Sequence, residues 1–63
     1  MPKTNAKVKL VGTDGNAFAI LGKVKAAIAK SDKPELAKEF MQEATSGDYN
    51  HLLDTCMDYV DVR

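Results

Sequence analysis

The feature that most constrains the fold is a change of hydrophobic period within the first 30 residues. Residues 7–11, KVKLV, alternate polar and apolar side chains, which is typical of a half-buried strand with Val8 and Leu10 facing inward. From residue 17 the apolar side chains recur at helical spacing, at Ala17, Ile20, Leu21, Val24, Ala27 and Ile28. We therefore expect a strand, a turn and then a helix over residues 16–30.

The turn GTDGN, residues 12–16, leaves a second interpretation open. Asp14-Gly15 is a favoured pair for a two-residue hairpin turn, which would make residues 16–22 a second strand. The helical stripe is longer than this signal and favours the helix, with Asp14 or Asn16 as its N-cap.

Start and stop signals indicate two further helices. Asp32 and Glu35 form a variant of the capping box, and Gly47 is the residue expected to end that helix in the left-handed conformation. The apolar face of this second helix is Leu36, Ala37, Phe40, Met41 and Ala44. Asp48 then caps a third helix. Its apolar stripe is Tyr49, Leu52, Leu53, Cys56, Met57 and Val60.

The C-terminal tail has two possible conformations. Residues 59–62, YVDV, either continue the third helix or, because they alternate and are β-branched, leave it as a short strand. A lone strand cannot satisfy its main-chain groups, so residues 7–11 pair with this tail or with a second chain. The expected fold is α+β: three amphipathic helices packed with a short N-terminal strand and, in the second case, a short C-terminal strand. Residues 1–63 form one small domain, with residues 1–6 loose.

Length and cysteine content restrict how this chain is stabilised and where it resides. A chain of 63 residues builds a marginal core, and its single cysteine excludes an internal disulfide. The single cysteine and the lack of a signal peptide both suggest a reducing compartment, so we expect a cytoplasmic protein. No apolar run approaches the roughly 20 residues that span a bilayer, so we expect no membrane partner. Cys56 lies within the third helix's apolar stripe, and we expect it to pack in the core.

The charge is divided between the two halves of the chain. Residues 1–33 carry seven lysines and two aspartates, a net charge of +5, whereas residues 34–63 carry a net charge of −5. The two halves either fold against each other and cancel, or leave a basic patch that could meet an anionic partner.

The turn is the first candidate site. The amides of Gly12, Thr13, Gly15 and Asn16 could cradle an anion at a helix N-terminus, with Lys23 nearby. The spacing departs from the P-loop and dinucleotide patterns, and a calcium loop would need further ligands and a final glutamate. A tight corner with a capping side chain is the simpler interpretation.

The third helix carries the second candidate site. His51 and Asp54 are three residues apart and could touch, and with Asp58 they could hold a divalent metal or act as an acid–base pair. A solvated helix face explains the same residues, so we expect no catalytic residue, no metal and no cofactor. The last two helices have a helix-turn-helix outline, but Asp48 and the other aspartates of the third helix would repel phosphates, so we do not expect this helix to read DNA. A weaker nucleic-acid contact through the lysines at positions 7, 9, 23 and 30 stays open.

Two segments, VGTDGNAFAILG and EATSGDYNHLLDTCMDYV, resemble a small family of uncharacterised bacterial and phage-associated proteins. The resemblance covers most of the chain and implies a compact cytoplasmic domain. The family has no known activity, so it implies no functional residues.

Phe18 is a large aromatic side chain that the apolar stripe of the first helix does not include. It lies about 120° from the centre of the first helix's apolar stripe, where it either marks an interface or packs under the N-terminal strand or the C-terminal tail. We predict a small non-enzymatic protein-interaction module, self-associating or binding another protein, with Val8, Leu10 and Phe18 at the interface. The alternative is an anion-binding protein that uses the turn and nearby lysines for a nucleotide, phosphate or nucleic acid. A third hypothesis is a minimal enzyme that uses His51 with Asp54 or Asp58.

Overall fold

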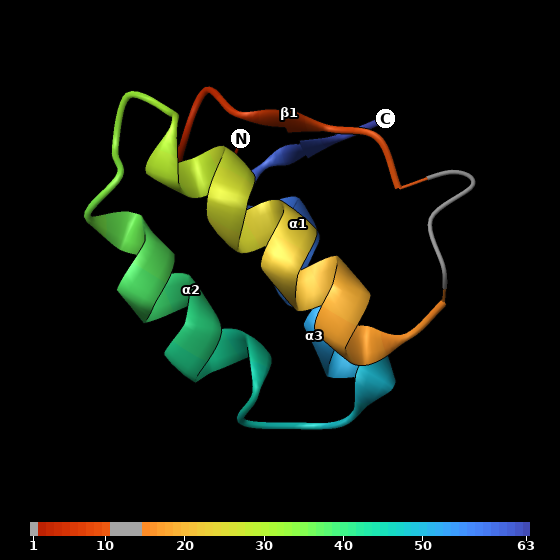
Figure 1. Cartoon of the computed structure of the whole chain (residues 1–63). Helices are drawn as coiled ribbons and strands as arrows, with labels where there is room; N and C mark the ends of the chain where they lie inside the picture. Colours follow the sequence, from red (N-terminus) through yellow and green to blue (C-terminus); the bar gives the residue numbers. More distant parts are fainter. Residues whose placement is uncertain (1, 11–14) are drawn as a thin grey trace.

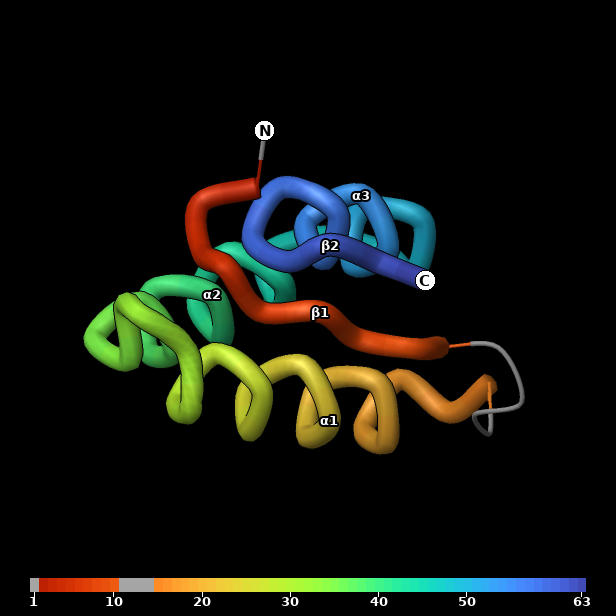
Figure 2. The backbone as a smooth tube through the Cα atoms, turned by 90° about the horizontal axis from the view of Figure 1, so that it is seen from above, coloured from red at the N-terminus to blue at the C-terminus, as the bar shows by residue number. Residues whose placement is uncertain are grey.

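The computed structural model describes residues 2–10 and 15–63, which form three helices and a two-stranded parallel sheet (Figure 1). The elements in chain order are β1 (Lys7–Val8), α1 (Ala17–Ala29), α2 (Leu36–Ala44), α3 (Tyr49–Tyr59) and β2 (Asp61–Val62). The helices pack against one another, and the strands cross one end of them (Figure 2). The α+β class is confirmed, and α1 shows that the hairpin interpretation of residues 16–22 is wrong.

The chain's own tail is the partner of the N-terminal strand. Lys7 pairs with Asp61 and Val8 with Val62 in parallel register. The Arg63 N–H donates to the Val8 carbonyl at 2.7 Å. The tail therefore leaves α3 as a strand.

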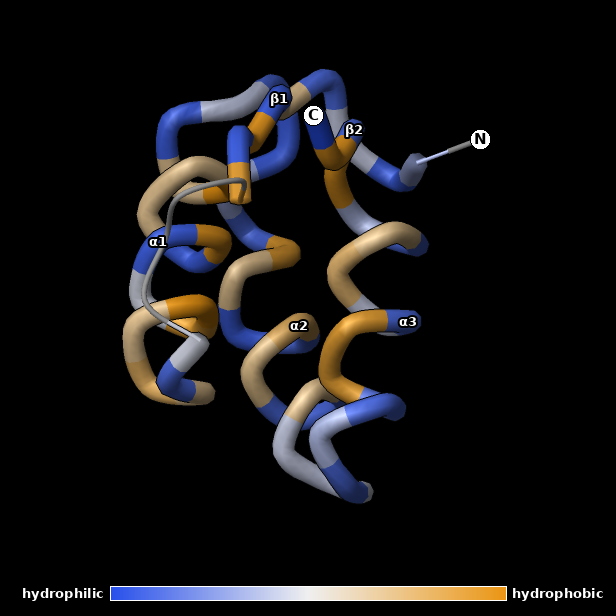
Figure 3. Tube along the Cα trace, turned by 90° about the vertical axis from the view of Figure 1, so that its right-hand side faces the viewer, coloured by the Kyte–Doolittle hydropathy of each residue, from blue (hydrophilic) through white to orange (hydrophobic). Residues whose placement is uncertain are grey.

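The core lies between the helices and β1. Val24, Ile28, Phe40 and Cys56 are fully buried, and the stripes predicted for α1 and α2 face inward. Figure 3 shows the hydrophobic segments of α1 and α3 turned toward one another. The rings of Phe40 and Tyr59 meet edge to face, with centroids 5.5 Å apart.

The buried face of α3 differs from the predicted stripe. Thr55 and Tyr59 are buried, whereas Tyr49 and Met57 are 43% and 56% exposed. Burial of these polar side chains is tolerated because each hydroxyl has a partner: Thr55 Oγ1 donates to the His51 carbonyl at 2.7 Å. The Tyr59 hydroxyl donates to the Glu39 carboxylate at 2.7 Å. Apolar spacing alone therefore placed Tyr49 and Met57 incorrectly.

The capping box predicted before α2 does not form. Glu35 is itself in the helical conformation and makes no side-chain cap. The Asp32 carboxylate instead accepts from the Asn5 N–H at 2.9 Å, and the Asn5 side-chain oxygen accepts from the Asp32 N–H at 3.1 Å. This reciprocal pair joins the N-terminal segment to the loop between α1 and α2, a long-range contact that competes with the local cap.

Gly47 does not adopt the predicted left-handed conformation. A glycine is needed there for space, because a β-carbon would lie 2.8 Å from Cγ of the His51 ring. Asp48 caps α3 as expected, with its carboxylate accepting from the His51 N–H at 2.9 Å.

The N-terminal segment is held in place, in contrast to the expectation that residues 1–6 are loose. The Lys3 N–H donates to the Asp58 carbonyl at 2.9 Å, and the Thr4 hydroxyl donates to the Tyr59 carbonyl at 2.7 Å. The last carbonyls of a helix lack partners within that helix, and here the N-terminal segment supplies them. Residues 3 and 4 thus cap α3.

Candidate functional site

An open apolar hollow lies where α1 begins, α2 ends and α3 begins. Its volume is about 280 Å³, and six of its lining residues are Ala17, Phe18, Leu21, Ala44, Tyr49 and Leu52. We call this site the aromatic hollow. Phe18 is 83% exposed beside it, and Tyr49 is the second exposed aromatic. Large apolar side chains grouped at the surface around a depression are typical of binding sites.

The start of α1 fixes the position of Phe18. The Asn16 side-chain oxygen accepts from the Phe18 N–H at 2.8 Å, which sets the first turn of the helix. The buried face of α1 begins at Ile20 and Leu21, so Phe18 points outward. The interpretation in which Phe18 packs under the strand or the tail is therefore wrong.

The other two interface candidates lie elsewhere. Val8 is 3% exposed and belongs to the core, and Leu10 packs partly buried against that core. The Leu10 N–H also donates to the Arg63 carbonyl at 3.3 Å. Of the three candidates, Phe18 is the one with a largely exposed side chain.

The structure describes two of the four turn residues that were candidates for anion binding. Gly12 and Thr13 lie outside the described residues, and Gly15 is exposed. Asn16 acts as the N-cap of α1, as the sequence suggested. The Lys23 ammonium donates to the Lys9 carbonyl, so Lys23 approaches the segment that leads into the turn.

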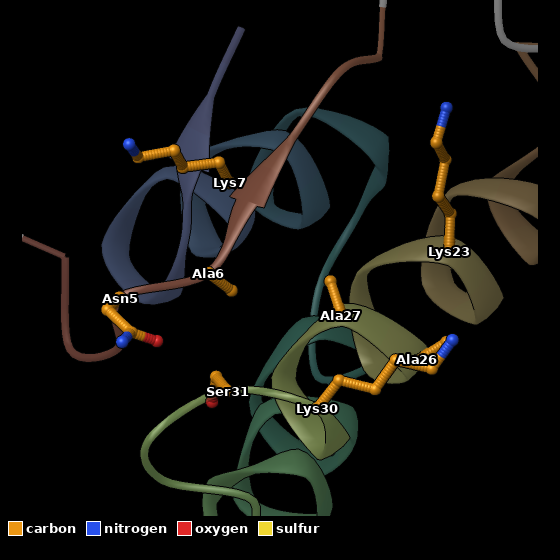
Figure 4. A pocket seen from close by; sticks show the side chains of 8 residues that line it. All are labelled: Asn5, Ala6, Lys7, Lys23, Ala26, Ala27, Lys30 and Ser31. Atoms are coloured by element: carbon orange, nitrogen blue, oxygen red, sulfur yellow. The ribbon is translucent and has the colours of Figure 1, made fainter.

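A second depression lies between β1 and the C-terminal half of α1 (Figure 4). Its volume is about 500 Å³, and its lining includes Ala6, Lys7, Lys23, Ala26, Ala27 and Lys30. We call it the basic groove. Lys23 and Lys30 are seven residues apart on one helix face, which the sequence reveals. The contribution of Lys7 depends on how β1 crosses α1, and no local pattern predicts that.

The His51 ring makes hydrogen bonds at the C-terminal end of α2. Its Nε2–H donates to the Glu43 carbonyl at 2.9 Å, and the Ser46 hydroxyl lies 3.1 Å from the same nitrogen. The Glu43 carboxylate is 3.6 Å away. No hydrogen bond or ion pair between His51 and Asp54 or Asp58 is found, and the described part of the chain contains no cluster of metal-binding side chains.

Cys56 is fully buried, as expected, and burial raises the pKa of its thiol. The reactive thiolate is thereby disfavoured.

Tyr59 is the centre of a polar network at the strand end of the helices. The hydrogen bond from Tyr59, together with Lys3, lowers the pKa of Glu39. The Lys3 ammonium lies 3.6 Å from the Glu39 carboxylate and 4.6 Å from the centre of the Tyr59 ring. The pKa of Tyr59 is raised, mainly by burial of the side chain and next by its hydrogen bond to Glu39. The network joins the N-terminal segment, α2 and α3.

None of the helices in residues 2–10 and 15–63 has the length and apolar character required to cross a bilayer. No family model, curated protein or solved structure matches this chain.

Proposed function

We propose that the chain is a non-enzymatic protein-interaction module that associates with a second copy of itself through the aromatic hollow. The observation that carries the proposal is Phe18, which is 83% exposed beside a hollow of about 280 Å³. Leaving a phenylalanine in water forgoes about 1.5–3 kcal/mol of burial free energy, which a partner can recover.

The arrangement of Phe18 suits a two-fold pair. Phe18 both projects from the surface and lines the hollow, so in an isologous dimer each ring faces the hollow of the other copy. Tyr49 of α3 also lines the hollow, and aromatic residues are enriched at interfaces. A standard interface buries roughly 800 Å² per partner. The chain exposes 4042 Å², so such an interface would cover about one-fifth of it.

The proposal is tested by light scattering behind a sizing column, at low and high salt. We expect a dimer that persists at high salt, because apolar contacts are not screened. The Phe18→Ser variant should elute as a monomer. Met57→Ser is the matched control, since Met57 is exposed on α3 but does not line the hollow. A monomeric parent chain, or a dimer unaffected by Phe18→Ser, would rule out the proposal.

The cytoplasm is the location that we propose, and the buried free thiol of Cys56 suits a reducing compartment. Membership of the uncharacterised bacterial and phage-associated family stays a prediction.

Anion binding at residues 12–16 is the alternative function. It is favoured by the contact of Lys23 with the Lys9 carbonyl, which holds an ammonium close to the segment before the turn. Titration with inorganic phosphate tests it. Saturable shifts of the Gly15 and Asn16 amides that disappear at high salt would support this alternative. Unchanged amides at millimolar phosphate would exclude it.

A further inference from the structure

The outer faces of α1 and α3 carry opposite charges. The charged side chains of α1 and its C-cap are Lys23, Lys25 and Lys30, and all three are exposed. Those of α3 are Asp54 and Asp58, which are also exposed. α1 contains no acidic residue, and α3 contains no lysine or arginine. One helix is therefore basic along its outer face, and the other is acidic.

The two helices lie on opposite sides of the molecule. Figure 2 shows α1 along one side and α3 along the other, with β1 between them, and Figure 3 shows the same separation from a second direction. The buried residues of each helix turn toward the core, so the two outer faces point away from each other. Two copies in the same orientation can therefore bring a basic face and an acidic face together.

The charges on these faces are not paired within the chain. The ion pairs among the described residues join Lys3 to Glu39, His51 to Glu43 and Arg63 to Asp61. Neither Lys25 nor Lys30 takes part in an ion pair in this part of the chain, and the same holds for Asp54 and Asp58. The basic and acidic halves of the sequence thus do not cancel through direct contact on these two faces.

Met57 adds an apolar side chain to the acidic face. It is 56% exposed and lies three residues after Asp54 and directly before Asp58. The outer face of α1 carries short side chains beside its lysines, at Gly22, Ala26 and Ala29. A flexible thioether side chain adapts to an irregular surface, so Met57 can pack where such short side chains leave room. The two faces are therefore complementary in both charge and relief.

We propose that α3 of one copy binds α1 of the next copy through these outer faces. Asp54 and Asp58 meet Lys25 and Lys30, while Met57 packs on the short side chains of α1. Because the contact joins two different surfaces, it is heterologous, and repeating it produces a ring or an open chain of copies. None of these residues lines the aromatic hollow, so the contact is separate from the dimer proposed there.

This contact should be weak and sensitive to salt. Ion pairs between exposed side chains contribute little each and are screened by salt. We expect the contact to be dissociated at the roughly micromolar concentrations of a sizing column and to form at about 0.5 mM protein in about 0.02 M salt. In about 0.5 M salt it should be lost, whereas apolar contacts in the hollow persist. Concentration and salt therefore separate the two modes of association.

Amide spectra of the Phe18→Ser variant test the contact without the hollow dimer. Raising the protein concentration from about 0.02 to about 0.5 mM at low salt should shift the amides of residues 22–30 and 54–58 together, because each copy uses both faces. In about 0.5 M salt these shifts should vanish. Unchanged spectra at low salt, or shifts on one face alone, would overturn the proposal.

Charge reversals test whether the contact is heterologous. In the same background, Lys25→Glu and Asp54→Lys each place like charges across the contact, and each alone should weaken association by about tenfold. When the two variants are mixed in equal amounts, opposite charges face each other again, and association should return to within about threefold of the starting variant. A mixture that associates no better than its components would contradict the proposal.

A matched control and a competitor complete the test. Lys38→Glu makes the same change of charge at an exposed position of α2, and association should stay within about twofold. Equal weakening by Lys38→Glu and Lys25→Glu would show that net charge matters and the α1 face does not. Duplex DNA that shifts the amides of residues 22–30 at micromolar concentration would assign the basic face to nucleic acid instead. Thermal melts of all variants check that the fold is retained.

Discussion

The two ends of the three helices are built differently. At the strand end, the N-terminal segment, β2 and the end of α3 pair their polar groups, and the aromatic Tyr59 is buried with its hydroxyl bonded to Glu39. At the hollow end, where α1 and α3 begin, Phe18 and Tyr49 are exposed around an open depression. The large aromatic side chain at the strand end is therefore buried, whereas the two at the hollow end leave apolar surface exposed, and this is the surface that we propose for a partner.

The largest expected effect comes from breaking the strand end at Val8. Val8→Glu would bury an unpaired carboxylate in the core, at a cost of roughly 3–5 kcal/mol. Because so small a domain has little stability to lose, we expect this variant to be mostly unfolded by circular dichroism. Lys7→Gln, a change at an exposed position of the same strand, is the control and should melt close to the parent chain. A folded Val8→Glu variant would show that the strand end is not what stabilises the fold.

A substitution at Gly47 should destabilise the hollow end from within. Gly47→Ala places a β-carbon against the His51 ring, and relieving that overlap should cost about 1–3 kcal/mol in urea unfolding. Gly22→Ala is the matched control, because a β-carbon there meets nothing within 4 Å. In the middle of α1 that change should stabilise the chain by about 1 kcal/mol. Equal effects at the two glycines would contradict the packing of His51 over residue 47.

The Tyr59 network should give the strand end a pH dependence. The pKa of Glu39 is below its ordinary value of 4.5 in the folded chain, so its contribution is present above that value and is lost as the pH falls through the folded value. Tyr59→Phe removes the main cause of this shift and should lower the stability at neutral pH. The loss of stability on acidification should then be smaller than in the parent chain, as measured by urea unfolding across pH. An unchanged acid profile would mean that Tyr59 does not perturb Glu39.

The smallest effect on stability is expected at Phe18. Phe18→Ser removes an exposed side chain and should change the free energy of unfolding by less than about 0.5 kcal/mol in the monomer. The measurement is urea unfolding at low protein concentration, where a dimer adds little. A loss of 2 kcal/mol or more would show that Phe18 stabilises its own chain.

The sequence correctly predicted those features of the fold that depend on interactions between neighbouring residues. The stripe of α1, the cap at Asp48 and the strand character of residues 7–8 follow from spacing and capping chemistry, and each is confirmed. Prediction failed where a distant segment supplied a partner. Asp32 bonds to Asn5, 27 residues away, instead of capping α2.

The candidate sites, too, could be predicted only in part, because they depend on contacts between segments that are far apart in the sequence. The position of Phe18 off the stripe is readable from helical geometry. Its exposure is not, because a side chain at that position could also pack under the N-terminal strand or the C-terminal tail. The hollow beside it depends on where α2 and α3 meet, and the groove depends on the path of β1 over α1. These are tertiary features without a local signature.

The most direct test of the central claim is a series of amide spectra recorded over a range of protein concentrations. If the hollow end is the contact surface, amides of residues 17–21 and 48–52 will shift with concentration, while those of residues 4–8 and 60–62 stay fixed. Shifts confined to the strand end, or spectra that do not change with concentration, would contradict the account.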